Sequence, residues 1–232
     1  MNEKNFAGEI SKITQQKAGK EDVIPEIKEE YFEFEKIKNK IVFRLVNYDK
    51  NKEALKKCPY FEFCDLAIVF DVVVAEFNDC CMTYRIDNCM AKRWKVSKAV
   101  LYDIAYINTK DIFGIELFSV NDLFQKVFNR NREEYESSEL YAMTNKNMTW
   151  GAVNILYTDS LKQMADFLDS DLLILPSSVH EIILLKADPL SDTSLILRNM
   201  VQEINDTYVE EDEVLSNNIY HYNRNTNKIS IG

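Results

Sequence analysis

The period of the apolar and polar positions changes several times along the chain, and each change predicts a new structural element. Residues 26–40 carry apolar side chains at spacings of three and four, which is typical of one face of a helix. Residues 40–48 and 66–75 are rich in β-branched and aromatic residues and predict two strands, of which the second is buried. For the first of them a continuing helix is the alternative, because Ile37, Ile41 and Leu45 also share a helical face. Residues 50–58 predict a short helix that ends before Pro59.

A further strand and a helix are expected in the next forty or so residues. Residues 81–94 predict a partner strand for residues 66–75. Ser97 predicts the N-cap of a helix over residues 98–108, because its hydroxyl can accept a hydrogen bond from a backbone N–H group of the first turn. A shared apolar face is typical of a helix that packs on a core. In this helix the residues that share such a face are Val100, Ile104 and Ile107.

The order of elements is clearest after residue 139, where it reads strand, strand, helix, strand, strand, helix. Paired strands followed by helices predict an α+β fold with mostly antiparallel sheets and helices on one face. The predicted elements are strands at 140–145 and 151–157, a helix at 161–169 capped by Asp159 or Ser160, strands at 171–176 and 180–187, a helix at 194–209, and a terminal strand pair at 219–222 and 228–231.

The chain also contains one stretch that is typical of an internal boundary. Residues 130–138 combine high charge density with no periodicity. We therefore expect a loose N-terminal tail over residues 1–25, a first α+β subdomain over 26–129 and a second, ββαββα subdomain over 139–232. The length of 232 residues is also compatible with one compact unit.

Composition indicates a soluble intracellular protein. The chain is 46% hydrophobic and 28% charged, which is typical of a folded globular protein. Its N-terminus mixes charge into every short apolar stretch and offers no signal peptide. The longest apolar run, residues 66–70, is far shorter than the roughly 20 residues of a membrane-spanning helix. We expect a cytoplasmic protein without a membrane partner.

The cysteines are few and unevenly placed. Five of them, spaced C-x5-C-x15-C-C-x7-C, lie between Cys58 and Cys89. This spacing lacks the paired C-x2-C knuckles of a tetrahedral zinc site, and an odd count fits thiols in a reducing compartment. Packing as small buried side chains is the favoured interpretation. The candidates for a thiolate metal site are Cys64, Cys80, Cys81 and Cys89.

The formal net charge of −10 comes from the second half of the chain. Residues 112–232 hold 9 Lys and Arg against 19 Asp and Glu, whereas residues 1–111 hold 19 of each kind. An acidic surface repels phosphate groups, so we expect no nucleic-acid partner. The same surface permits a basic protein partner, which includes the alternative that the chain mimics nucleic acid and inhibits a basic protein.

The candidate catalytic residues lie together between two predicted strands. They are Ser177, Ser178, His180 and Glu181. A serine beside a histidine invites the hypothesis of a hydrolase-like nucleophile. A hairpin turn explains the same residues, because serines so close to a histidine in a turn seldom reach its ring and the G-x-S-x-G elbow is absent.

Other chemistry is sparse in the sequence. Asp65 and Asp71 flank an apolar strand, and carboxylates at strand ends sometimes bind a metal or act as bases, although they more often solvate the strand ends. The five glycines are too scattered for a phosphate-binding loop, so no cofactor is expected.

Four extended segments of the chain resemble one known family. They are RLVNYDKNKEALKKCPYFEFCDLAIVF at residues 44–70, MTNKNMTWGAVNILY at 143–157, DLLILPSSVHEIILLKAD at 171–188 and INDTYVEEDEVLSNNIYHY at 204–222. From about Glu30 to its end, the chain resembles the bacterial (Firmicutes) domain-of-unknown-function family 5688. Its second half more faintly resembles the uncharacterised YtpQ-like proteins. The resemblance implies a fold-level grouping and no reaction, cofactor or catalytic residue.

Together these features favour an uncharacterised cytosolic protein that acts as a non-enzymatic interaction or regulatory module. The absence of catalytic and nucleotide-binding motifs, the acidic second half and the aromatic residues in polar surroundings support a protein partner. The sequence leaves the oligomeric state open. Two alternatives remain: an enzyme with a hydrolase-like site near residues 177–181, and the acidic inhibitor that mimics nucleic acid.

Overall fold

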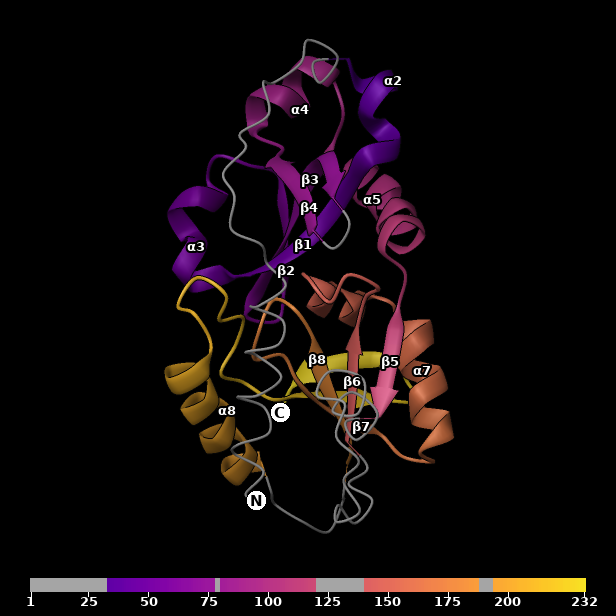
Figure 1. The fold of residues 1–232 in the computed structure, drawn as a ribbon, viewed down its shortest axis with the longest axis vertical. Helices are drawn as coiled ribbons and strands as arrows, with labels where there is room; N and C mark the ends of the chain where they lie inside the picture. The colour runs from indigo at the N-terminus through magenta and orange to yellow at the C-terminus, as the bar shows by residue number, and fades with distance from the viewer. Residues whose placement is uncertain (1–32, 78–79, 120–139, 188–193) are drawn as a thin grey trace. The chain divides into compact units, whose positions relative to one another are not determined.

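The described part of the chain folds as two compact units that divide between Gly114 and Ile115. The computed structural model describes residues 33–77, 80–119, 140–187 and 194–232 (Figure 1). We call residues 33–114 the first unit and residues 115–232 the second unit. The predicted N-terminal tail and the charged stretch at 130–138 lie outside the described residues, so the predicted boundary stays a prediction.

The first unit is built around one long strand, β3 (Leu66–Phe77). The other elements of this unit are α2 (Phe34–Ile37), a 3-10 helix η2 (Lys38–Lys40), β1 (Ile41–Asn47), α3 (Tyr48–Leu55), β2 (Tyr60–Phe63), β4 (Cys80–Arg85), α4 (Asn88–Trp94) and α5 (Lys98–Phe113). β1, β2 and β4 all pair antiparallel with β3, and Phe43 of β1 lies opposite Phe70. A β-bulge between Val73 and Ala75 shifts the register of β3 against β4.

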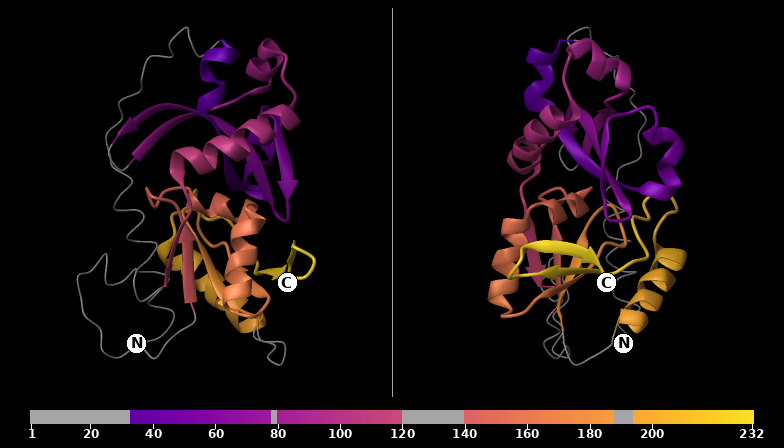
Figure 2. Two further views of the ribbon diagram at one scale, coloured as in Figure 1. Left: turned by 90° about the vertical axis from the view of Figure 1, so that its right-hand side faces the viewer. Right: turned by 180° about the vertical axis from the view of Figure 1, so that it is seen from behind.

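The two faces of this sheet carry different helices. On one face α5 packs against aromatic residues, where the ring of Tyr102 lies 5.8 Å from that of Phe43 and 5.6 Å from that of Phe61. Figure 2 shows α5 lying across the sheet. Ser97 accepts a hydrogen bond from the backbone N–H of Val100, which confirms the predicted cap. The buried cluster on the side of α3 comprises Leu55, Cys58, Ala67 and Val69.

The face of α5 that contacts the core differs from the predicted one. Val100 and Ile107, predicted on the packing face, are 41% and 61% exposed. Tyr102 and Tyr106 both contact the ring of Phe43 and turn their own side of the helix toward the sheet. The buried residues of α5 follow a spacing of four and are Leu101, Ala105, Thr109 and Phe113.

Asp71 is fully buried in β3 and joins two arginines from the neighbouring strands. Its carboxylate accepts hydrogen bonds from Nε of Arg44 on β1 and from Nε of Arg85 on β4. The hydroxyl of Thr83 donates to the same carboxylate at 3.2 Å. Burial alone raises the pKa of Asp71, but the two guanidinium groups outweigh it and hold the pKa below its ordinary value. The ionised carboxylate therefore ties three strands together.

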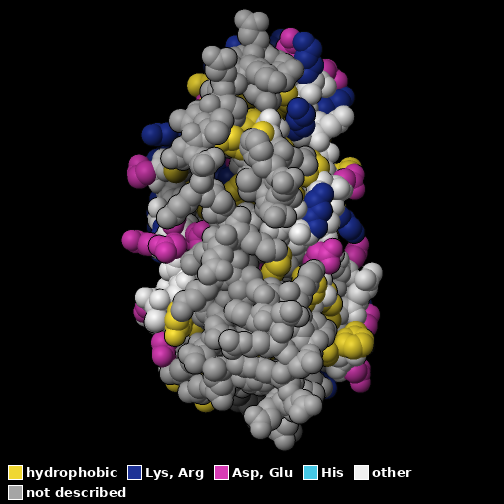
Figure 3. Space-filling view, viewed as in Figure 1, with side chains coloured by type: hydrophobic (Ala, Val, Ile, Leu, Met, Phe, Trp, Pro, Cys, Tyr) yellow, Lys and Arg dark blue, Asp and Glu magenta, His cyan; other side chains and the backbone are white. Residues whose placement is uncertain are grey.

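Charge is unevenly distributed over the two units. On the face drawn in Figure 3, most of the visible Lys and Arg side chains lie over the first unit, in keeping with the acidic excess after residue 111.

Among the described helices, none combines the length and the apolar character that crossing a membrane requires.

The second unit contains a six-stranded antiparallel sheet. Its elements are β5 (Glu116–Ser119), β6 (Leu140–Thr144), a 3-10 helix η3 (Gly151–Leu156), α7 (Thr158–Phe167), β7 (Leu172–Leu175), β8 (Ile182–Lys186), α8 (Ser194–Tyr208), β9 (Tyr220–Asn223) and β10 (Lys228–Ile231). The strand order is β10-β9-β7-β8-β6-β5. The sequence β5-β6-α7-β7-β8-α8 confirms the α+β class and the ββαββα order.

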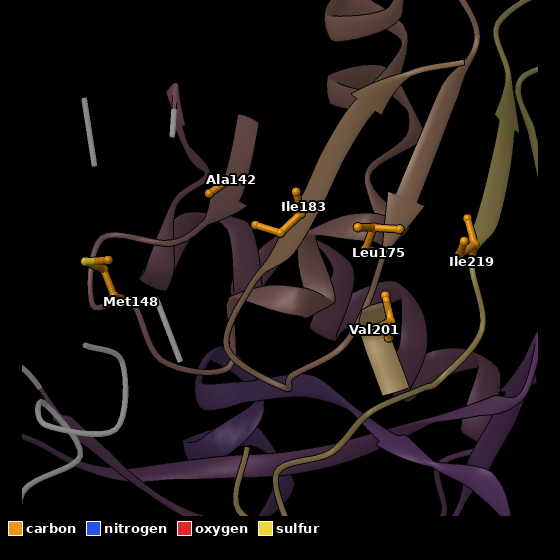
Figure 4. Packing of buried hydrophobic residues seen from close by; sticks show 6 residues of the cluster. All are labelled: Ala142, Met148, Leu175, Ile183, Val201 and Ile219. Atoms are coloured by element: carbon orange, nitrogen blue, oxygen red, sulfur yellow. The ribbon is translucent and has the colours of Figure 1, made fainter. Parts of the chain in front are cut away.

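Helices cover both faces of this sheet, whereas the sequence predicted helices on one face. On one face Val201 of α8 packs into a buried cluster with Leu175 of β7 and Ile183 of β8 (Figure 4). On the other face the ring of Tyr141 in β6 meets the ring of Phe167 in α7 edge-on, at 6.2 Å. Both β7 and β8 are apolar at consecutive positions, and successive side chains of a strand point to opposite faces. Each face of the sheet therefore needs a cover.

Two predicted elements and one predicted helix cap differ in the structure. The strand predicted over residues 151–157 is replaced by η3 at 151–156, because β6 already has β5 on one edge and β8 on the other. Residues 88–94 form α4 rather than a continuation of β4, because Asp87 caps a helix by accepting a hydrogen bond from the N–H of Met90. α7 begins at Thr158 without a side-chain cap, so neither Asp159 nor Ser160 has the predicted role.

Replacing Asp71 with Asn should destabilise the first unit strongly, because it leaves two arginines beside a neutral group. We expect a loss of about 3 kcal/mol in the free energy of unfolding at pH 7, measured by chemical denaturation. Because the pKa of Asp71 is lower in the folded state, its ionised carboxylate stabilises the fold at pH values above its unfolded-state pKa of about 4. This stabilisation is lost as the pH falls through the folded-state pKa. The difference between wild type and variant should therefore shrink below about pH 4.

The matched control is Glu62→Gln, at an exposed residue of β2. It should change the free energy of unfolding by no more than about 0.5 kcal/mol. Equal effects of the two substitutions would contradict the role assigned to Asp71.

Candidate functional site

The loop between β7 and β8 contains all four candidate catalytic residues and is held by the segment that follows α8. The backbone N–H of Val179 donates to the carbonyl of Glu213 at 3.0 Å. The backbone N–H of Leu215 donates to the carbonyl of Ser177 at 2.9 Å. These two bonds bring the carboxylate of Glu213 beside the imidazole of His180.

The imidazole of His180 is buried, with 2% of the residue exposed. Its Nδ1 accepts a hydrogen bond from the backbone N–H of Trp150 at 3.4 Å. A ring nitrogen that accepts carries no proton, so the neutral ring has its proton on Nε2. Nε2 lies 3.0 Å from Oε1 of Glu213 but outside the direction of a hydrogen bond, and it has no hydrogen-bond partner among the described residues.

The carboxyl group of Glu181 is buried next to this imidazole. Burial raises its pKa, and the nearby carboxylate of Glu213 raises it further. The imidazole of His180 and the hydroxyl of Ser178 act in the opposite direction, and the pKa remains above its ordinary value. Oε2 of Glu181 has no hydrogen-bond partner within the described part of the chain. Burial therefore works against the charged form of Glu181.

β6 and η3 form the frame around this cluster. The hydroxyl of Thr144 donates to the carbonyl of His180 at 2.8 Å, and Nδ2 of Asn154 donates to the carbonyl of Thr144. Gly151 lies close to both Thr144 and His180, and a Cβ atom there would stand 2.6 Å from the carbonyl oxygen of His180. Trp150 has a left-handed φ of 56°, which aims its N–H at the imidazole. Side-chain bonds and close packing, rather than a repeating pattern, shape this segment.

The geometry pairs these residues differently from a serine hydrolase. Oγ of Ser178 accepts a hydrogen bond from the backbone N–H of His180 at 2.9 Å, while the two imidazole nitrogens face other groups. Ser177 is buried in the same loop. A nucleophilic serine needs its oxygen bonded to the base. The arrangement brings one imidazole and two carboxyl groups together, but it does not aim the hydroxyl of Ser178 at the imidazole.

The three candidate metal ligands with described side chains, Cys64, Cys81 and Cys89, do not form a common site. Within the described residues, no three His, Cys, Asp or Glu side chains gather closely enough to hold a metal ion. Cys81 is buried in β4 and Cys89 is exposed in α4. Partial burial, and then the carboxylate of Asp65, raise the pKa of the Cys64 thiol to about 11, which opposes the thiolate form of a ligand. The side chain of Cys80 lies outside the described residues.

Sequence reasoning grouped Ser178, His180 and Glu181 but did not identify their neighbours from other elements. Glu213 stands in the sequence as the last residue of an acidic run. The one local signal for its position is the apolar pair that follows it, which is typical of a segment lying against a core. Of the two carboxylates predicted at strand ends, Asp71 instead lies within β3 and is engaged by arginines, as described above.

Comparison with known proteins identifies a family. The model of DUF5688, a family of unknown function, matches residues 2–224 of the chain. No curated protein and no solved structure matches the chain. The match confirms the resemblance read from the sequence and extends it toward the N-terminus beyond Glu30. The Firmicutes origin and the likeness to YtpQ-like proteins stay predictions.

Replacing Glu181 with Gln should make the second unit less sensitive to pH. Because the pKa of Glu181 is higher in the folded state, the folded state has its full stability at pH values below the unfolded-state pKa of the carboxyl group. The free energy of unfolding then decreases as the pH rises toward the folded-state pKa. The Gln variant lacks this cost, so its advantage over wild type should grow as the pH rises above about 4, to about 1–3 kcal/mol. Denaturation at a series of pH values measures the difference. The exposed control Glu210→Gln should show no such trend, and a flat difference for Glu181→Gln would contradict the assignment.

Replacing Gly151 with Ala should disrupt the frame of the cluster. The added Cβ meets the hydroxyl of Thr144 and the carbonyl of His180, so we expect a loss of about 2 kcal/mol or more in the free energy of unfolding. Because the hydroxyl is the nearest atom, Thr144→Ala should relieve part of the clash in the double variant. Strictly additive effects in the double-mutant cycle would contradict this contact.

Proposed function

We propose that this chain, which belongs to the DUF5688 family, is a non-enzymatic protein-binding module that docks through helix α5. The observation that supports the proposal is that α5 is apolar on two opposite faces. One face packs on the sheet of the first unit, as described above. The other carries Val100, Ile104 and Ile107, which we call the α5 stripe.

The α5 stripe is continuous along the outer side of the helix. Its spacing of four and three residues places the three side chains on one face. Ile107 is 61% exposed, Val100 is 41% exposed and Ile104 is half-buried. Scattered apolar residues are ordinary on a protein surface, but a helix that is apolar on both sides is typically covered on both.

The gain from covering the stripe is large enough to support binding. Full burial of one Val or Ile side chain contributes about 1.5–3 kcal/mol relative to full exposure. Because part of each side chain is already covered, a partner would recover only a fraction of this amount. Three such residues, with polar neighbours around them, fit a reversible interface with an apolar centre.

Acid–base chemistry at the His180 cluster is a second candidate function. The observation that favours it is the raised pKa of a buried carboxyl group beside an imidazole, since such groups concentrate at active sites as well as in structural networks. The position of the Ser178 hydroxyl, on a backbone N–H rather than on the ring, argues for the structural interpretation.

The acidic inhibitor that mimics nucleic acid has less support. A mimic needs a row of carboxylates that face solvent without cations of their own. In the second unit Asp166 pairs with Lys162, and Asp169 pairs with Arg224. Asp171 accepts a hydrogen bond from the backbone N–H of Arg224 at 3.0 Å. These three acids are therefore engaged within their own unit.

Substituting the most exposed residue of the stripe, Ile107, should weaken partner capture without harming the fold. Ile107→Lys places a cation four residues from both Asp103 and Asp111, which suits the helix. The variant and the wild type, each immobilised, are compared for the proteins retained from a lysate, including untagged copies of the chain. We expect at least a tenfold loss of the retained partner, which is about 1.4 kcal/mol.

The matched control is Phe167→Lys, at the 72% exposed last residue of α7, where a cation also suits the helix end. It should retain the partner. Loss of the partner with Phe167→Lys but not with Ile107→Lys would contradict the proposal and move the docking surface to the second unit.

A further inference from the structure

We infer that the partner of the α5 stripe is a second copy of this chain, with the two α5 helices packed antiparallel. This inference rests on the proposed function, because it names the occupant of the same surface. Three features of α5 support it: the spacing of the apolar residues, the placement of two exposed charges, and the engagement of the opposite flank within the chain.

The spacing of the stripe suits a second helix of the same sequence. Val100, Ile104, Ile107 and Asp111 follow one another at intervals of four, three and four, which is the seam of two helices that pack side by side. A two-fold axis between the helices places Ile104 of each copy opposite Ile107 of the other. The same register sets Val100 opposite Asp111, so the apolar seam is short and ends where water reaches it.

Two exposed charges beside the stripe are complementary only in one orientation. Asp103 and Lys110 are seven residues apart and flank the stripe on the same side. In an antiparallel pair of identical helices, flanks of the same side face each other. Asp103 of one copy then faces Lys110 of the second copy, and symmetry repeats the pair.

The opposite flank of the stripe offers no charge of α5 that could pair with Asp103 of a second copy. It carries Asn108, whose side chain donates to the backbone carbonyls of Lys38 and Ile41 at 2.7 and 2.9 Å. A parallel pair would place Asp103 of one copy against this flank of the other, where no cation of α5 lies. The charges therefore favour the antiparallel arrangement.

The size of the contact predicts a weak and reversible dimer. A seam of three side chains from each copy lies well below the roughly 1,200 Å² of total buried surface that stable interfaces reach. We expect association in the range of tens to hundreds of micromolar, on the order of 6 kcal/mol or less. Because exposed ion pairs are screened, added salt should weaken the dimer.

Sedimentation velocity over a concentration series tests the inference with the full chain. The weight-average mass of the wild type should rise with concentration, and Ile107→Lys should lower the association constant at least tenfold. Asp103→Lys and Lys110→Asp should each lower it about fivefold, because each creates two repulsive pairs across the axis. The double variant Asp103→Lys/Lys110→Asp should return to within about threefold of the wild type, since both pairs are restored with reversed sign.

The outcomes separate the inference from the proposed function. A wild type that stays monomeric throughout the series would overturn the inference, while partner capture that still depends on Ile107 would leave the proposed function standing. A dimer that the double variant does not restore would overturn the antiparallel register. Circular dichroism of each variant, with an unchanged melting temperature, shows that α5 is folded in every comparison.

Discussion

Aromatic packing between α5 and the sheet of the first unit is the interaction on which the rest of the account depends. The ring of Phe43 contacts Tyr102 and Tyr106, and the ring of Phe61 contacts Tyr102. Each aromatic pair contributes about 0.5–1.5 kcal/mol beyond the area that it buries. Together the rings fix the rotation of the helix about its axis, and this rotation leaves Ile107 on the outer side.

The same sheet is held from its other face by charge. Asp71 joins Arg44 and Arg85 across three strands, in a position where an unpaired carboxylate would be costly. The sheet that supports α5 is thus fixed by aromatic contacts on one face and by an ion-pair network on the other. A rigid support of this kind suits a surface that binds through its shape.

The second unit uses buried polar groups for a different purpose. Within the described part of the chain, the side chains of His180 and Glu181 have an incomplete set of hydrogen bonds, and the segment around Glu213 closes over them. Such a network fixes the path of the chain after α8, although it contributes little net stability because its polar groups lose their water. The cluster is a part of the fold that a change of pH can weaken.

Periodicity and capping residues predicted most elements with strong local signals. The apolar run of β3, the cap at Ser97 and the strand pair β7–β8 are confirmed, because each depends on residues that lie close in sequence. The strand predicted at residues 151–157 was wrong, because β5 and β8 already occupy both edges of β6. The outer position of Ile107 was missed for a similar reason, because the rings that turn α5 come from another strand.

The residues of the candidate site were likewise predicted only in part from the sequence. Ser178, His180 and Glu181 were found from their proximity in sequence, whereas Glu213 and Trp150 reach the imidazole from segments about 30 residues away in opposite directions. Apolar pattern encodes which segments are buried, but not which polar side chains meet inside. Those contacts follow from the register of strands and from backbone turns such as the left-handed residue Trp150.

The most direct test of the central claim is methyl NMR of the wild type across a range of concentrations. If α5 docks through its outer face, the methyl signals of Val100, Ile104 and Ile107 should shift as concentration rises. The signals of Leu195 and Ile231, which are exposed on the second unit, should stay in place. Shifts confined to the second unit, or α5 methyl signals that do not move either with concentration or on addition of a captured partner, would contradict the account.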